Sequence, residues 1–124
     1  MITTYAAAPL NAPTLTERIA LDRRARLFVA HLSWVMVVSP HDRARVLHGY
    51  PVEPEHDREE AMAWCLAEVE RIHRSGGRMD VLLRDDGTLS PGCAEEVALW
   101  RKLGGEPGAW RMRECGRFVR ARCP

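Results

Sequence analysis

The sequence predicts an α/β fold, a doubly wound three-layer sandwich around a mainly parallel sheet of four or five strands. First, short β-prone apolar runs alternate along the chain with longer segments that have helical periodicity. Second, the run at 34–39 (WVMVVS) is almost wholly apolar, which is typical of a strand covered on both faces. Third, a chain of 124 residues suits one compact domain, so a single domain is expected over 1–124.

A first strand and a first helix are expected near the N-terminus. Residues 2–6 (ITTYA) are short and β-prone, and the loop that follows at 8–14 contains two prolines. Thr14 and Glu17 form a T-x-x-E capping box, which marks the start of a helix. Apolar side chains then recur at helical spacing, at Leu21, Ala25, Phe28, Val29 and Leu32.

The middle of the chain predicts a second strand, a long loop and a second helix. The strand is the apolar run at 34–39. Residues 40–56 have no sustained period, so they predict a long loop, of the kind that often forms a lid or a binding loop. Asp57 and Glu60 repeat the capping-box pattern, and an apolar stripe then continues to the SGG sequence at 75–77, where glycine ends the helix.

The last third predicts a strand, a helix and two weaker strands. Residues 79–84 (MDVLLR) form the expected strand. Ser90 is a good N-cap and Pro91 fits the first position of a helix that continues to about Leu103. The weaker strand candidates are 109–115 (AWRMREC) and 117–123 (RFVRARC).

This alternation of strands and helices is typical of flavodoxin-like or Rossmann-like sheets, with helices on both faces. Ligands of such sheets bind at the carboxyl ends of the strands. The loops after Tyr5, Val38 and Leu83 are therefore expected to meet at one edge, and that edge is where a functional site is expected.

Composition and charge exclude several classes of protein. The formal net charge of +1 gives no global reason to expect a nucleic-acid or membrane partner. No apolar run approaches the ~18 residues of a membrane-spanning helix, and the N-terminus lacks the basic region of a signal peptide. The four cysteines show no C-x-x-C spacing and the five histidines no tight metal-ligand spacing. Reduced thiols, no metal, no other cofactor and a cytoplasmic location are expected.

The helix expected at 91–103 carries two adjacent acids, Glu95 and Glu96. At about 100° per residue, Glu95 falls on the solvent side, whereas Glu96 falls inside the apolar arc between Leu99 and Trp100. Glu96 then either lies at the margin of the arc and turns to water, or lines a pocket at the edge of the sheet. A carboxylate in such a pocket can act as a nucleophile or a base.

Around Glu96 the residues form a recognisable pattern. Asp80 precedes the apolar run VLL, and Ser90, Gly92 and Glu96 follow as S-x-G-x-x-x-E before VALWRKLGG. This pattern resembles the nucleoside 2-deoxyribosyltransferase-like superfamily, and within it a branch of short, largely uncharacterised bacterial and phage proteins. The resemblance covers most of 2–110. The segments that carry it are 37–41 (VVSPH), 53–66 (EPEHDREEAMAWCL) and 78–104.

The resemblance implies an enzyme of N-glycosidic bonds that acts on a nucleoside or a nucleoside monophosphate, either as a hydrolase or as a deoxyribosyltransferase. It implies that Glu96 is the nucleophile that attacks the anomeric carbon, and that Ser90 and Gly92 hold a phosphate or the sugar at the start of the helix. The alternatives are that Ser90 is a plain N-cap and that Gly92 is only a small residue where the helix meets the loop.

Four further residues are expected near the ligand. Tyr5 ends the first strand, where the family often presents an aromatic or polar group, although a half-buried strand tyrosine is an equally good interpretation. Pro9 stands in a first loop that usually contains glycine in active members, and His41 opens the long loop. The helix before the third strand lacks the Asp that serves the enzymes as proton donor. Asp85 is left for that role, unless Asp85 and Asp86 are only turn residues.

Two other classes of function stay open: a non-catalytic domain that binds a nucleotide-derived ligand in the same cleft, and a small interaction protein with a degenerate pocket. Because members of the superfamily commonly form oligomers, a homo-oligomer such as a dimer is expected, with Trp64 as a residue that faces a partner subunit. The C-terminal segment 110–123 contains five arginines. A solvated strand face explains them, and a phosphate or nucleic-acid patch is the alternative.

Overall fold

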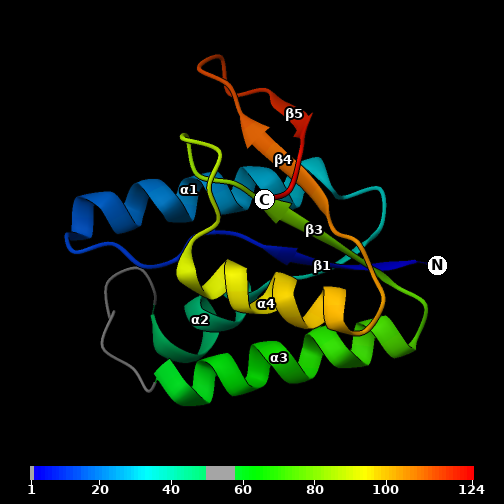
Figure 1. Ribbon diagram of the computed structural model, residues 1–124. Coiled ribbons are helices and arrows are strands. Elements are labelled where there is room, and N and C mark those ends of the chain that lie inside the picture. Colours follow the sequence, from blue (N-terminus) through cyan, green and yellow to red (C-terminus); the bar gives the residue numbers. More distant parts are fainter. Residues whose placement is uncertain (1, 50–57) are drawn as a thin grey trace.

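The computed structural model describes residues 2–49 and 58–124. Its elements are β1 (Thr3–Ala7), α1 (Leu15–His31), β2 (Met36–Val38), α2 (Pro40–His48), α3 (Arg58–Arg74), β3 (Arg78–Leu82), α4 (Pro91–Lys102), β4 (Gly108–Met112) and β5 (Phe118–Ala121) (Figure 1). Within the described part of the chain, no helix combines the length and the apolar character needed to cross a bilayer.

The five strands form one sheet in the order β2-β1-β3-β4-β5. β1 is parallel to both β2 and β3, β3 is parallel to β4, and only β5 runs antiparallel to its neighbour. The predicted mainly parallel sheet is therefore confirmed. The connection after β1 leads to β2 on one side of β1, and the connection after β2 leads to β3 on the other side. The topological switch point of the sheet therefore lies between β1 and β3.

Helices cover both faces of the sheet, which confirms the three-layer sandwich (Figure 1). On one face α3 and α4 pack side by side, and their buried residues Cys65, Val69, Val97 and Trp100 meet Tyr5 and other side chains of the strands. On the other face α1 packs through Ala25, Phe28 and Leu32. Successive residues of β1 alternate between these two cores, as the period of a strand requires.

The helix starts follow the predicted capping chemistry. The Thr14 hydroxyl accepts a hydrogen bond from the Glu17 backbone N–H at 3.2 Å, and the Ser90 hydroxyl accepts one from the Cys93 N–H at 3.3 Å. Both side chains satisfy donors that the first turn of a helix leaves without partners. These caps fix where α1 and α4 begin.

The loop predicted over 40–56 is wrong in its first half, because Pro40–His48 form α2. Ser39 caps this helix through the backbone N–H of His41, Pro40 occupies the first turn, and Gly49 ends the helix in the left-handed conformation. The start signal is the same Ser-Pro pair that begins α4. A helix of nine residues is too short to show a sustained apolar period, so the pattern does not reveal it. Residues 50–57, including Asp57, lie outside the described residues.

The apolar run at 34–39 does not form a strand covered on both faces. Only Met36–Val38 pair as a strand, and β2 lies at the edge of the sheet, where Met36 is 57% exposed. Trp34 precedes the strand and is also exposed, with the Arg78 guanidinium 4.7 Å from its ring centroid. An apolar run alone therefore does not distinguish a central from an edge strand in this chain.

Asp80 is fully buried in the centre of the sheet and accepts four hydrogen bonds. Thr4 Oγ1 donates to Oδ2 at 2.6 Å and Trp110 Nε1 donates to Oδ1 at 2.9 Å. Arg78 donates through Nε at 3.0 Å and through Nη2 at 2.9 Å. Gly108, the partner of Asp80 on β4, leaves room for this carboxylate, since a Cβ there would lie 2.8 Å from Oδ1. Asp80 therefore ties β1, β3 and β4 together.

Candidate functional site

Glu96 lies in the second turn of α4 and points into the layer between this helix and the sheet. It is 5% exposed, whereas the neighbouring Glu95 is exposed to solvent. The helix begins at Pro91, so residues 93, 96, 97 and 100 share the face that packs on the strands. The alternative in which Glu96 turns to water is therefore wrong, and the chain holds a carboxylate in its core.

Tyr5 and two cysteines surround this carboxylate. Burial, and secondarily Glu95, raises the pKa of Glu96 to about 7, while interaction with the Tyr5 hydroxyl acts in the opposite direction. Burial, together with the Glu96 charge, raises the pKa of Tyr5 well above its usual value. The same two causes raise the pKa of Cys65 to about 11 and that of Cys93 to about 12. Both thiols are therefore protonated at neutral pH.

Two polar atoms at this place lack a well-formed hydrogen bond within the described residues: Oε2 of Glu96 and the hydroxyl of Tyr5. The Tyr5 hydroxyl and the Glu96 carboxyl lie close enough for a hydrogen-bond interaction that affects both pKa values, but its geometry is not that of a well-formed hydrogen bond. Buried polar groups in folded proteins nearly always have partners. Two such atoms side by side therefore point to a polar group of a ligand, or to a water molecule, between β1 and α4.

Tyr5 links this place to the switch point of the sheet. It stands in the middle of β1, opposite Val38 of β2 and Met79 of β3. β2 ends at Val38, and α2 begins two residues later. Arg43 of α2 reaches α3, where its guanidinium lies 4.8 Å from the ring centroid of Trp64. Helix α2 therefore lies beside the carboxyl end of β2, next to the layer that contains Glu96.

His41 is buried at the start of α2 and interacts with a different carboxylate. Its pKa is lowered to about 3 by burial and, less strongly, by Arg45, while Asp22 acts in the opposite direction. Asp22 belongs to α1, accepts a 2.7 Å hydrogen bond from Arg45, and lies 3.0 Å from the guanidinium of Arg26. Because α1 covers the face opposite to α4, the described partners of His41 are not shared with Glu96. His41 is uncharged at neutral pH.

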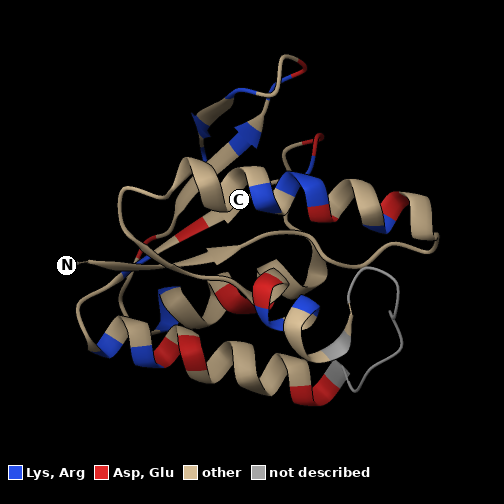
Figure 2. Cartoon of the chain, turned by 180° about the vertical axis from the view of Figure 1, so that it is seen from behind, with Lys and Arg blue, Asp and Glu red and all other residues tan. Residues whose placement is uncertain are grey.

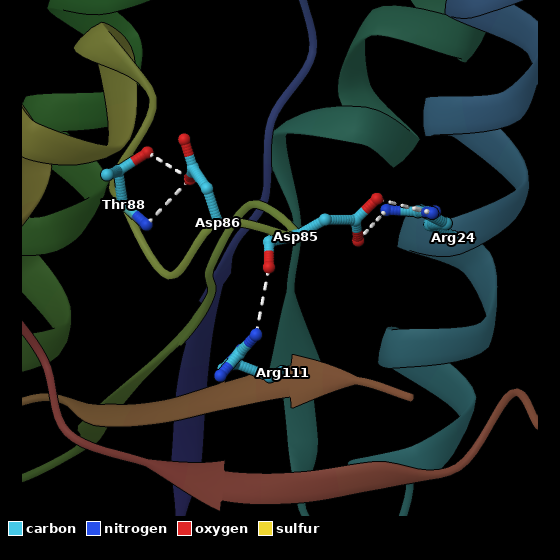
Figure 3. Close-up of polar contacts among 5 residues, drawn as sticks. All are labelled: Arg24, Asp85, Asp86, Thr88 and Arg111. Atoms are coloured by element: carbon cyan, nitrogen blue, oxygen red, sulfur yellow. Dashed lines mark hydrogen bonds and ion pairs between the residues drawn. The ribbon is translucent and has the colours of Figure 1, made fainter. Parts of the chain in front are cut away.

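Asp85 follows β3 but turns away from α4. Its carboxylate accepts two hydrogen bonds from Arg24 of α1, at 2.7 and 3.1 Å, as Figure 3 shows. The hydrogen bonds from Arg24 lower the pKa of Asp85. An exposed acid that is already ionised is a poor proton donor at neutral pH. Asp85 therefore does not match the role of a general acid beside Glu96.

The loop between β3 and α4 is shaped by its own side chains. Asp86 accepts hydrogen bonds from the Thr88 backbone N–H at 3.0 Å and from the Thr88 hydroxyl at 2.6 Å (Figure 3). This is a turn in which an Asp side chain replaces a backbone acceptor. Arg111 of β4 donates to the backbone carbonyl of Asp85 at 2.9 Å. The structure therefore agrees with the interpretation that Asp85 and Asp86 are turn residues, rather than with a role for Asp85 as proton donor.

Pro9 is buried directly after β1, where a loop residue can border a ligand. Ser90 acts as the N-cap of α4, the simpler of its two interpretations. Gly92 has a helical backbone, and a Cβ added to it would meet only Met62 Sδ, at 3.8 Å, an ordinary contact. Nothing in the packing of the described residues requires glycine there.

Replacement of Gly92 by Ala therefore tests whether a ligand approaches the first turn of α4. The free energy of unfolding is expected to stay within about 1 kcal/mol of the original value, or to rise, because Ala favours helix over Gly. Binding or turnover of a nucleoside ligand is expected to fall at least tenfold if the ligand backbone contacts this turn. Denaturant titration and a ligand-binding or turnover assay on the same variant measure the two quantities, and unchanged affinity and turnover would remove Gly92 from the site.

The helical pattern predicts that Glu96 faces the sheet, but it does not predict the residues that surround it. Cys65 and Cys93 lie on the apolar faces of α3 and α4 and look like ordinary core residues. Asp22 could have been found, because it stands three residues before Ala25, on the buried stripe of α1. A buried acid on such a stripe predicts cationic partners, and these are Arg45 of α2 and Arg26 one turn further along α1.

Trp64 does not present a free aromatic surface. It is half-buried against the core of α3 and α4 and carries Arg43 over its ring. The expectation of an oligomer therefore gains no support from this residue. Comparison of the chain with models of known protein families, with curated proteins and with solved structures finds no significant match.

Proposed function

We propose that this chain is an enzyme of N-glycosidic bonds, with a nucleoside or nucleoside monophosphate as substrate and Glu96 as nucleophile. The observation that supports this most is a core carboxylate with a pKa of about 7 that faces the Tyr5 hydroxyl. A buried charge of this kind is costly to the fold, so a functional role is its simplest explanation. The S-x-G-x-x-x-E pattern that ends at Glu96 points to the same chemistry.

The proposed reaction has two steps. In the first, a carboxylate oxygen of Glu96 forms an ester bond to the anomeric carbon, while the bond from that carbon to the base nitrogen breaks and its electron pair leaves with the base. In the second, water attacks the anomeric carbon and the ester bond breaks, so that free sugar and the carboxylate are released, while the proton that water loses is taken up by the departed base. If a second base attacks instead of water, the result is a transfer.

The surroundings of Glu96 suit this role. With a pKa of about 7, a substantial fraction of the carboxyl is ionised at neutral pH. Little water solvates this carboxylate, and a poorly solvated anion is more reactive toward the developing positive charge of the sugar. Tyr5 is a positioning residue in this scheme, because its hydroxyl can donate a hydrogen bond to the carboxylate oxygen that does not attack.

A second candidate function is non-catalytic binding of a nucleotide-derived ligand. The observation that favours it is the Arg24–Asp85 ion pair, which holds the expected proton donor away from α4. Without a general acid, departure of the base is slower by about 10²–10⁴-fold. Such a site would bind the same class of ligand and release no base.

The deciding experiment incubates the protein with purine and pyrimidine nucleosides and their 5′-monophosphates, in ribo and deoxy forms, and measures free base by chromatography. We expect base release from one subset of the panel, with the rate increasing with pH through about 7 as Glu96 ionises. Glu96→Gln is expected to lower that rate at least 100-fold, because the amide cannot form the ester. Intact-mass analysis is expected to show a sugar adduct that Glu96→Gln lacks.

Glu95→Gln is the matched control, since it removes the same charge from the adjacent exposed position of α4. It should release base like the original protein. Equal loss in both variants would show that charge on the helix, rather than a nucleophile, matters. Saturable binding of a panel member without release would favour the binding domain, and neither binding nor release across the panel would contradict both functions.

A further inference from the structure

Basic side chains are concentrated at one end of the molecule, on the hairpin formed by β4 and β5. The last 17 residues hold five arginines and one acid, Glu114, although the whole chain has a net charge of only +1. In Figure 2 the strands of this hairpin carry blue segments, and its tip extends beyond the helical layers. The remainder of the chain is net acidic, so the charge of the hairpin is not a property of the whole surface.

Three of these arginines have no ion-pair partner among residues 2–49 and 58–124. Arg113 and Arg117 flank the turn, where their backbones are joined by a 2.8 Å hydrogen bond, and Arg122 follows β5. All three side chains are exposed. The other two are partly engaged: Arg111 donates to a loop carbonyl, and Arg120 lies 4.2 Å from the ring centroid of Trp110. Several positive charges on one short hairpin repel each other unless an anion is bound.

One side of the hairpin, from its turn to the end of β5, borders an open hollow of about 1080 Å³. Its walls come from α1, the β3–α4 loop and both strands of the hairpin. Their charged residues are five arginines and two acids: Arg24, Arg111, Arg113, Arg120, Arg122, Asp85 and Glu114. This volume lies at the upper end of the range for small-molecule sites, so the hollow can border an extended ligand. No Phe, Tyr or Trp lines it, and the surface therefore lacks the aromatic platforms on which single-stranded bases stack.

We propose that the β4–β5 hairpin binds the sugar-phosphate backbone of duplex DNA. Arginine forms paired hydrogen bonds with phosphate, and the positions of Arg113, Arg117 and Arg122 place such donors at the tip and along one strand. A two-stranded ribbon fits the major groove of B-form DNA, whereas the major groove of duplex RNA is too narrow for it. This inference is independent of the proposed enzyme, whose Glu96 lies in the layer between α4 and the sheet.

The test measures fluorescence anisotropy of a labelled 20-base-pair DNA duplex titrated with the full chain at several salt concentrations. Three phosphate contacts predict a slope of about −2.7 for log affinity against log salt, a loss of about 40-fold between 50 and 200 mM. The triple variant Arg113→Gln, Arg117→Gln, Arg122→Gln is expected to bind at least tenfold more weakly at 50 mM salt. For this variant, the slope of log affinity against log salt is expected to lie between about −1 and 0.

Arg71→Gln, Arg74→Gln, Lys102→Gln is the control, since it removes the same formal charge from the C-terminal ends of α3 and α4, away from the hairpin tip. Unlike the tested arginines, Arg71 and Arg74 are ion-paired, with Glu68 and Glu70. The control should bind the duplex like the original chain, and thermal unfolding checks that both triple variants are folded. Equal weakening in the two variants would overturn the proposal. So would tighter binding of the single strand or of duplex RNA of the same length, or no saturable binding of the DNA duplex.

Discussion

Glu96→Gln is expected to raise the free energy of unfolding by about 3 kcal/mol at pH 8, and by less than about 1 kcal/mol at pH 5. The carboxyl has a pKa of about 7 in the folded chain and about 4.5 when it is solvated. At pH values between about 4.5 and 7, the folded state binds more protons than the unfolded state. Stability that depends on Glu96 is therefore highest below about pH 4.5 and falls as pH rises through 7. Gln has no charge to bury, so it avoids this loss.

Urea denaturation of the original chain, Glu96→Gln and Glu95→Gln at the two pH values measures the effect. Glu95 is exposed and contributes less than burial to the raised pKa of Glu96, so its variant should follow the original chain closely at both pH values. The prediction concerns a difference between pH values, and other groups that titrate contribute equally to all three proteins. A gain in Glu96→Gln that is the same at pH 5 and pH 8, or no gain at pH 8, would contradict it.

The same ionisation has opposite consequences for stability and for the proposed chemistry. The reaction needs the carboxylate, which forms as pH rises through about 7, and the fold loses stability over that same interval. A residue that served packing alone would have no reason to be an acid, because Leu or Met would fill the place without this cost. If Glu96→Gln both stabilises the fold and abolishes base release, then Glu96 lowers the stability of the chain in order to provide its activity.

The fold and the burial of Glu96 could be predicted from local chemistry. Ser90 and Pro91 fix the start of α4, and once the start is known, the angle of 100° per residue decides which of two adjacent glutamates faces the sheet. Periodicity carries this information because it fixes direction within an element. Tyr5 is expected near the ligand only from the resemblance, which places an aromatic or polar group at the end of the first strand, and the residue lies in the middle of β1 instead.

The surroundings of the site could not be predicted in this way, because contacts between elements decide them. Asp85 follows β3 in sequence, but its direction is set by Arg24, which lies 61 positions earlier on α1. His41 belongs to a nine-residue helix with no visible period, and Asp22 and Arg45 determine what surrounds it. Whether a side chain at the end of a strand turns toward one face or the other depends on these partners, and no spacing in the sequence encodes them.

Asp80→Ala is expected to lower the free energy of unfolding by about 3–5 kcal/mol, a large part of the stability of a domain of this size. The substitution leaves the Arg78 guanidinium without its ion pair, and it leaves the Thr4 hydroxyl and the Trp110 indole N–H without an acceptor. Each buried donor that loses its partner costs about 1–3 kcal/mol. Urea denaturation, followed by Trp fluorescence and by far-ultraviolet circular dichroism, measures the loss.

Asp86→Ala is the matched control, because Asp86 is exposed and its contacts are confined to Thr88 in the same loop. It should cost about 1 kcal/mol or less. If the two variants were equally stable, the carboxylate of Asp80 would not join the strands. The outcome also separates the two buried acids of this chain. Asp80 has four donors around it and should stabilise the fold, whereas Glu96 has an unpaired oxygen and should destabilise it once ionised. If the free energy of unfolding at pH 8 falls in Asp80→Ala and rises in Glu96→Gln, then the carboxylate of Asp80 stabilises the fold and that of Glu96 destabilises it.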